Sequence, residues 1–130
     1  MALPPLILIV DDEAQFLEIF SAKLTSAGYR IQVADDGNKG IAMAKDLKPD
    51  LILMDMKMPN LTGAEALIKL QEDSDTKNIK VLFLSNLGDP QPEAQQLNDR
   101  FASQIGALGY LRKTDDLDIL VDRVGAILKK

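Results

Sequence analysis

The sequence predicts an α/β fold in which five strand–helix units form a (βα)5 doubly wound parallel sheet with helices on both faces. Short apolar runs of strand length recur along the chain. They are continuous rather than alternating, as in parallel strands that are covered on both faces. A stretch with helical apolar periodicity follows each run. The chain has 130 residues, which suits one domain, and right-handed crossovers join such units into one sheet.

The predicted strands comprise three strongly apolar runs and two weaker ones. The strong runs are Leu6–Val10, Leu51–Met54 and Val81–Leu84, and the weaker ones are Ile31–Ala34 and Tyr110–Leu111. The predicted helices follow them and are recognised by apolar residues three or four positions apart. In chain order these residues are Phe16, Phe20 and Leu24; Ile41, Ala44 and Leu47; Ala64, Leu67 and Ile68; Leu97, Phe101, Ile105 and Leu108; and Leu117, Leu120, Val121, Val124 and Leu128.

Turn and capping residues divide the chain at the same places. Gly is favoured after helix C-termini, Asp and Thr are favoured as N-caps, and Pro marks loops. Thr62 and Glu65 have the spacing of a capping box. The other signals are Gly28 after the first helix, Asp36-Gly37 before the second, Lys48-Pro49-Asp50 before the third strand, Pro90 and Pro92 before the fourth helix, and Thr114 or Asp115 before the fifth.

Composition and charge exclude several classes of function. With 20 acidic and 15 basic residues the formal net charge is −5, so we expect no broad cationic surface and no direct nucleic-acid binding. The absence of Cys and His excludes disulfides, thiolate or imidazole metal sites, Cys nucleophiles and His-based triads. The run Leu6–Val10 lacks a basic leader and stops at Asp11. We therefore expect no signal peptide, no membrane insertion and a cytoplasmic location.

Carboxylates follow two of the apolar runs, at the edge of the sheet where parallel α/β proteins bind ligands. Asp11, Asp12 and Glu13 follow the first run, and Asp55 follows the third. If these two strands are neighbours, three carboxylates converge, and the cluster requires a cation or raised pKa values. Hard oxygen ligands without sulfur or imidazole favour Mg²⁺, with Mn²⁺ as the alternative.

Each polar residue at a strand end also has an ordinary structural explanation when it is taken alone. Asp11 or Asp12 can cap the first helix, Ser85 can be a loop hydroxyl, and Lys113 can be a solvated charge. Asp55 is harder to explain in this way, because an unpaired carboxylate at the end of a buried strand is costly. The occurrence of such groups at four strand ends favours a functional site.

Four segments of the chain together resemble the receiver domain of two-component response regulators. They are Ile7–Glu13, Asp55–Pro59 with Gly63, Ser85, and Gly109–Lys113. The resemblance covers about residues 5–130 and implies one receiver domain over residues 1–130, with a core at about 5–129. It also implies a flavodoxin-like strand order of 2-1-3-4-5. Because the five units use nearly the whole chain, we expect no separate effector domain within it.

The resemblance implies a phosphoacceptor signalling domain rather than an enzyme with an external substrate. Asp55 would attack a phosphohistidine of a partner histidine kinase or histidine phosphotransfer protein, or a small acyl phosphate, and become an aspartyl phosphate. Asp12, Asp55 and the backbone carbonyl of Lys57 would hold Mg²⁺. Asp11 would act mainly through water, and Lys113 would supply a further positive charge.

Ser85 and Tyr110 are the switch residues that the resemblance implies. Ser85 would donate a hydrogen bond to the bound phosphoryl group, and its movement would let Tyr110 rotate inward. The change would reach a downstream target protein through the surface formed by the fourth helix, the fifth strand and the fifth helix. Activation can also bring two copies together as a homodimer.

Three features depart from the family pattern. Asn86 stands where a small residue is usual and could narrow access to the phosphoryl group. Thr114 follows Lys113 where Pro is common; without a tertiary amide a cis bond would cost ~3 kcal/mol, so we predict a trans peptide there. The spacing between Ser85 and Lys113 is longer than usual, and we place the extra residues at Leu87–Gln96, before the fourth helix.

Three alternative functions remain open. A phosphatase of the haloacid dehalogenase class has a second Asp two positions after its nucleophile, whereas Lys57 stands two positions after Asp55. A flavodoxin-like or nucleotide-binding module has a Gly- or Ser/Thr-rich loop after the first strand, where this chain has Asp11–Glu13. The third is a degenerate receiver that acts as a phosphorylation-independent adaptor, supported by Asn86 and the long segment that follows it.

Overall fold

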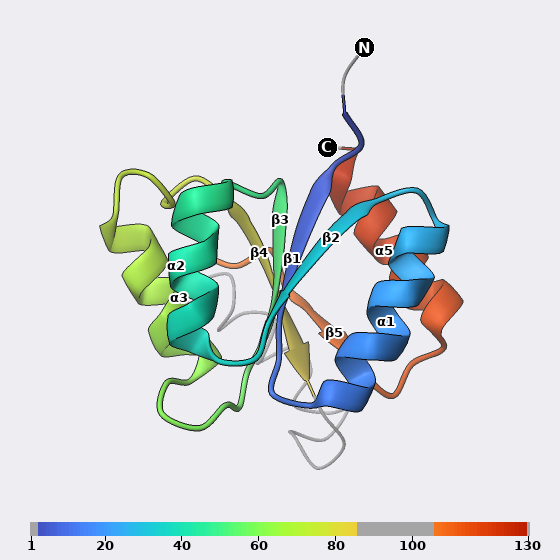
Figure 1. Ribbon diagram of the computed structural model, residues 1–130, viewed down its shortest axis with the longest axis horizontal. Helices are drawn as coiled ribbons and strands as arrows, with labels where there is room; N and C mark the ends of the chain where they lie inside the picture. The colour runs from blue at the N-terminus through green and yellow to red at the C-terminus, as the bar shows by residue number, and fades with distance from the viewer. Residues whose placement is uncertain (1–2, 86–105, 130) are drawn as a thin grey trace.

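The computed structural model describes residues 3–85 and 106–129, which form a parallel sheet with helices on both faces (Figure 1). The strand order is β2-β1-β3-β4-β5, so the predicted fold class is confirmed. The strands are β1 (Leu6–Val10), β2 (Arg30–Ala34), β3 (Leu51–Asp55), β4 (Lys80–Ser85) and β5 (Tyr110–Arg112). The helices are α1 (Ala14–Ser26), α2 (Gly37–Leu47), α3 (Gly63–Glu72) and α5 (Leu117–Leu128).

The three strong apolar runs become strands β1, β3 and β4, which are buried on both faces, whereas the weaker run at Ile31–Ala34 becomes the largely exposed edge strand β2. In β1, Ile7 and Ile9 pack with apolar residues of α1 and α5, whereas Leu8 and Val10 belong to a second cluster with α2 and α3. Figure 1 shows these two helix pairs on opposite sides of the sheet. Because successive side chains of a strand point to opposite faces, the interior positions of a central strand must be apolar, and polar residues are confined to its ends. This requirement accounts for the continuous runs in the sequence.

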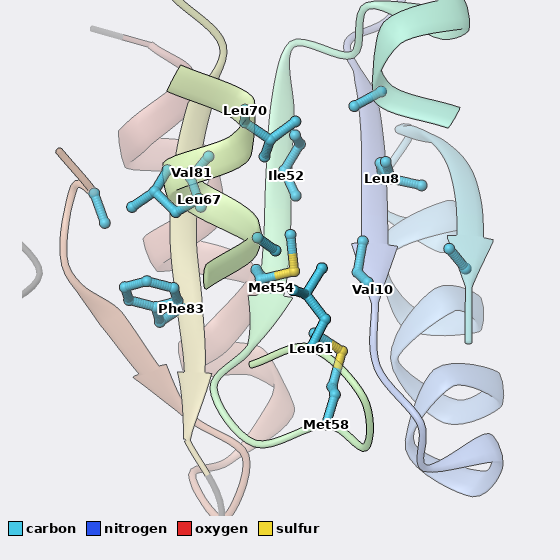
Figure 2. Packing of buried hydrophobic residues seen from close by; sticks show 14 of the residues in the cluster. Leu8, Val10, Ile52, Met54, Met58, Leu61, Leu67, Leu70, Val81 and Phe83 are labelled. Atoms are coloured by element: carbon cyan, nitrogen blue, oxygen red, sulfur yellow. The ribbon is translucent and has the colours of Figure 1, made fainter. Parts of the chain in front are cut away.

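The second cluster extends beyond the carboxyl end of β3. Figure 2 shows Met58 and Leu61, from the segment between β3 and α3, beside Met54 at the end of the strand. Both side chains are buried. This apolar support holds the segment that follows Asp55 against the sheet.

Most of the predicted boundaries are confirmed. Each observed strand begins and ends within one residue of its prediction. Asp36 caps α2 by accepting a hydrogen bond from the Lys39 N–H, and Thr62 forms the predicted capping box with Glu65. Gly28, just after α1, has a φ of 102°, a left-handed conformation that Gly adopts readily.

Two boundary predictions are wrong. The N-cap of α5 is Asp116, whose side chain accepts from the Asp118 N–H, rather than Thr114 or Asp115. The helical periodicity assigned through Leu108 does not continue that far. Gly106 has a φ of 98°, and the Leu108 N–H donates to the Val81 carbonyl, which leads the chain into β5.

The trans prediction at Lys113–Thr114 is confirmed, since the part of the chain that the structure describes contains no cis peptide bond. Several other predictions lie outside the described residues: Asn86, the segment Leu87–Gln96 with its two prolines, and the helical positions Leu97, Phe101 and Ile105.

Within residues 3–85 and 106–129, no helix is both long and apolar enough to cross a membrane.

Candidate functional site

Three carboxylates meet at the carboxyl edge of the sheet. Val10 at the end of β1 is in register with Met54 of β3, so the next residues, Asp11 and Asp55, lie at the same level on neighbouring strands. Both are buried, whereas Asp12 is exposed. One carboxylate oxygen from each of the three lies within 4.8 Å of the others. The predicted convergence of Asp11, Asp12 and Asp55 is therefore present.

Lys113 reaches into this cluster from the end of β5. Its backbone N–H donates to the Ser85 carbonyl at 2.8 Å, which fixes the start of the following turn. Its ammonium Nζ lies 2.5 Å from Asp11 Oδ2, 2.8 Å from Glu13 Oε1 and 3.5 Å from Asp55 Oδ1. The side chain is only 4% exposed, so the solvated-charge explanation of Lys113 is wrong.

Burial and mutual repulsion shift the pKa values of this cluster. Burial, with the negative charge of Asp11 added to it, raises the pKa of Asp55 to about 7, although Lys113 opposes the shift. Burial also raises the pKa of Asp11, against the hydrogen bonds from Lys113 and from the Glu13 N–H. Burial lowers the pKa of Lys113, but its bonds to Asp11 and Glu13 outweigh that effect and hold the pKa above its usual value. The site thus holds a charged ammonium and crowded carboxylates that an additional cation would stabilise.

Neither aspartate after β1 caps the first helix. The N-cap of α1 is Glu13, which makes no side-chain cap hydrogen bond. Instead, Asp11 Oδ1 accepts the Glu13 N–H at 2.8 Å, which orients the Asp11 carboxylate inside the cluster. The capping explanation of Asp11 and Asp12 is therefore excluded.

The segment after Asp55 is held close to the strand by Gly63. The Gly63 N–H donates to the Met56 carbonyl at 3.1 Å. A Cβ at position 63 would lie 2.3 Å from the Asp55 carbonyl oxygen and 3.1 Å from Met56 Cα. Only Gly allows α3 to start this close to β3. The Lys57 N–H faces Asp55 Oδ1 at 3.4 Å, so the Lys57 backbone lies beside this carboxylate.

The two predicted switch residues are both buried. Ser85 is the last residue of β4, and its hydroxyl donates to the Leu111 carbonyl at 3.4 Å. Tyr110, the first residue of β5, is 2% exposed and packs in the same apolar cluster as Phe83.

Sequence reasoning missed two residues that surround Lys113. Glu13 forms an ion pair with it, and the Phe16 ring centroid lies 5.0 Å from Nζ, a cation–π distance. The only signal in the sequence was the third acid of Asp11-Asp12-Glu13. Its partner stands 100 positions away along the chain.

Fold and site together define a doubly wound α/β protein with an acidic, lysine-containing cluster at the carboxyl edge of its sheet. Residues 7–125 match the response regulator receiver domain family. The chain belongs to this family and so to two-component signalling, in which receiver domains interact with histidine kinases or phosphotransfer proteins. Receiver domains bind Mg²⁺ at an acidic cluster, to which Asp11, Asp12 and Asp55 correspond here.

Individual relatives support the same assignment. The chain is 38% identical over 126 residues to the Synechocystis DNA-binding dual master transcriptional regulator RpaA, covering 97% of this chain but 50% of that protein. It is 33% identical to Protein PilH of Pseudomonas aeruginosa, covering 94% of this chain and 96% of PilH. It therefore spans about half the length of one relative and nearly all of the other.

Solved structures agree with the fold. The Vibrio cholerae chemotaxis protein CheY4 superposes with a TM-score of 0.82 at 28% identity, covering 95% of this chain and 98% of that one. The receiver domain of the Francisella response regulator 1452 gives a TM-score of 0.82 at 28% identity, with 96% and 97% covered.

Proposed function

We propose that Asp55 is the phosphoacceptor of this receiver and that its phosphorylation depends on Mg²⁺. The observation that supports this most directly is the meeting of Asp55 with Asp11, Asp12 and the Lys113 ammonium in one cluster. A nucleophilic carboxylate needs neighbouring positive charge when a phosphoryl group arrives. Lys113 supplies one such charge, and the acidic cluster can hold a second.

Phosphoryl transfer in this proposal joins one Asp55 carboxylate oxygen to phosphorus. At the same time, the bond from phosphorus to the donor breaks. That bond is N–P in a phosphohistidine of a kinase or phosphotransfer protein and O–P in a small acyl phosphate. The bonding electron pair leaves with the donor, and the product is an aspartyl phosphate. Asp55 must be ionised to attack, which the neighbouring Lys113 ammonium favours.

The donor set of the cluster fits Mg²⁺ or Mn²⁺. It offers carboxylate oxygens without sulfur or imidazole, and three carboxylates, of Asp11, Asp12 and Asp55, lie near the Lys113 ammonium. Asp12, Asp55 and the Lys57 backbone carbonyl would hold the ion, and Asp11 would act mainly through water. When bound, the ion neutralises charge on the carboxylates and on the phosphoryl oxygens.

Output in this proposal passes through Ser85 and Tyr110 to the surface of the fourth helix, β5 and α5. Residues 1–130 act as one signalling domain rather than as an enzyme on an external substrate. Movement of Ser85 toward the phosphoryl group would let the Tyr110 ring rotate inward and so change this surface. A downstream protein would bind this surface, and activation can produce a homodimer.

The test is intact-mass spectrometry after incubation with Mg²⁺ and acetyl phosphate. We expect one phosphoryl adduct on the wild-type protein, none without a divalent cation and none on Asp55→Asn. Asp46→Asn, which removes the same charge from an exposed position of α2, should be labelled like the wild type. Absence of an adduct on the wild type would overturn the proposal and favour a phosphorylation-independent adaptor.

A further inference from the structure

We propose that Glu13 is a positioning residue that restrains phosphorylation by competing with Asp55 for the Lys113 ammonium. This inference rests on the proposed function, because it concerns the rate at which Asp55 accepts a phosphoryl group. It assigns to Glu13 a role distinct from that of the metal-binding carboxylates. Glu13 would act through Lys113 and would touch neither the metal nor the phosphoryl group.

The distances around Lys113 favour Glu13 over the phosphoacceptor. Nζ lies 2.8 Å from Glu13 Oε1 but 3.5 Å from Asp55 Oδ1. A charge-assisted hydrogen bond between an ammonium and a carboxylate spans about 2.7–2.9 Å. The ammonium is therefore bonded to Glu13 and lies beyond that range from Asp55.

The backbone holds Glu13 in a position to make this bond. Its N–H donates to Asp11 Oδ1, and its carbonyl accepts the Leu17 N–H in the first turn of α1. Its side chain is 45% exposed, whereas Lys113 is enclosed between Asp11 and the Phe16 ring. One end of the ion pair is thus open to solvent and can separate without disturbing the core.

Charge gives the direction of the effect. A phosphoryl donor brings negative charge to a site that already holds Asp11, Asp12 and Asp55, and the Glu13 carboxylate adds to the repulsion. Together with Asp11 Oδ2 at 2.5 Å, it also holds the Lys113 ammonium at 3.5 Å from Asp55 Oδ1. Neutralising Glu13 removes both obstacles, so phosphorylation should become faster.

The experiment compares initial phosphorylation rates with Mg²⁺ and acetyl phosphate for three variants and the wild type. Glu13→Gln keeps the length of the side chain but not its charge, and we expect its rate to rise by about three- to tenfold, as for the loss of one nearby charge in a partly solvated site. Glu13→Asp keeps the charge on a shorter side chain, and its rate should lie between the wild-type rate and the Glu13→Gln rate. Glu18→Gln removes an exposed acid of α1, the helix that Glu13 precedes, and its rate should match the wild-type rate.

A second readout separates positioning from a merely structural role. Because Glu13 is partly exposed, salt should screen its charge, and the ratio of the Glu13→Gln rate to the wild-type rate should shrink as ionic strength rises. A rate for Glu13→Gln that equals or falls below the wild-type rate would overturn the inference. So would an equal gain in Glu18→Gln, or a gain that salt does not reduce. Absence of labelling in the wild type would instead defeat the proposed function itself.

Discussion

Ionisation of Asp55 should destabilise the metal-free protein, and Asp55→Asn should remove that cost. The pKa of Asp55 rises from an ordinary 3.8 to about 7, chiefly because the carboxyl is buried. A group whose pKa is higher in the folded state stabilises the fold while it is protonated, and this contribution is lost as the pH rises through the folded-state value. The free energy of unfolding should therefore fall between about pH 4 and pH 8.

The magnitude follows from the size of the shift. At about 1.4 kcal/mol for each pH unit, the change from 3.8 to about 7 corresponds to about 4 kcal/mol at full ionisation. Relaxation of the structure around the charge reduces the observable effect. We expect Asp55→Asn to raise the free energy of unfolding by about 2–4 kcal/mol at pH 8 and by little at pH 4.

Urea unfolding followed by circular dichroism, in the presence of a chelator and at several pH values, measures this difference. The free energy of unfolding should fall steeply with rising pH in the wild type and less steeply in Asp55→Asn. In that variant, the raised pKa of Asp11 leaves a residual pH dependence of the same sign. Asp46→Asn should retain the wild-type slope. A wild-type stability that is flat or rises over this range, or an Asp55→Asn variant with an unchanged slope, would refute the reasoning.

Three further predictions concern the site and its support. Gly63→Ala should lower the free energy of unfolding by about 1–3 kcal/mol, and with it the melting temperature, because the new Cβ would meet the Asp55 carbonyl. Gly125→Ala in α5 should lower the free energy of unfolding by less. Thr62→Ala should lower the free energy of unfolding by about 1 kcal/mol, because the capping box is lost. The same unfolding assay measures this change. Mg²⁺ should raise the melting temperature of the wild type more than that of Asp55→Asn; equal shifts in both would contradict a site that includes this carboxylate.

Much of the fold could be predicted from the sequence because each central strand is buried on both faces. Burial of this kind leaves a continuous apolar run, such as Leu51–Met54, whose limits can be read directly. The acids that follow such runs come together because the carboxyl ends of parallel strands share one edge. Asp11 and Asp55 were predicted to meet for this reason, and they do.

Features that depend on the tertiary arrangement could not be predicted in this way. The α5 cap lies at Asp116 because three neighbouring residues, Thr114 to Asp116, all favour N-caps, and only the course of the chain after β5 selects one. The bond from Glu13 to Lys113 depends on where α1 starts relative to β5. The apolar pattern that includes Leu108 looks helical, but a Gly with positive φ and a backbone bond to β4 direct that segment toward the sheet.

Identifying the phosphorylated residue is the most direct test of the central claim. The protein is phosphorylated with Mg²⁺ and acetyl phosphate and then treated with borohydride, which reduces an aspartyl phosphate to homoserine, and the modified position is located by peptide mass spectrometry. We expect homoserine at position 55 and an unmodified Asp11 and Asp12. Modification at Asp11 or Asp12, with Asp55 intact, would contradict the central claim.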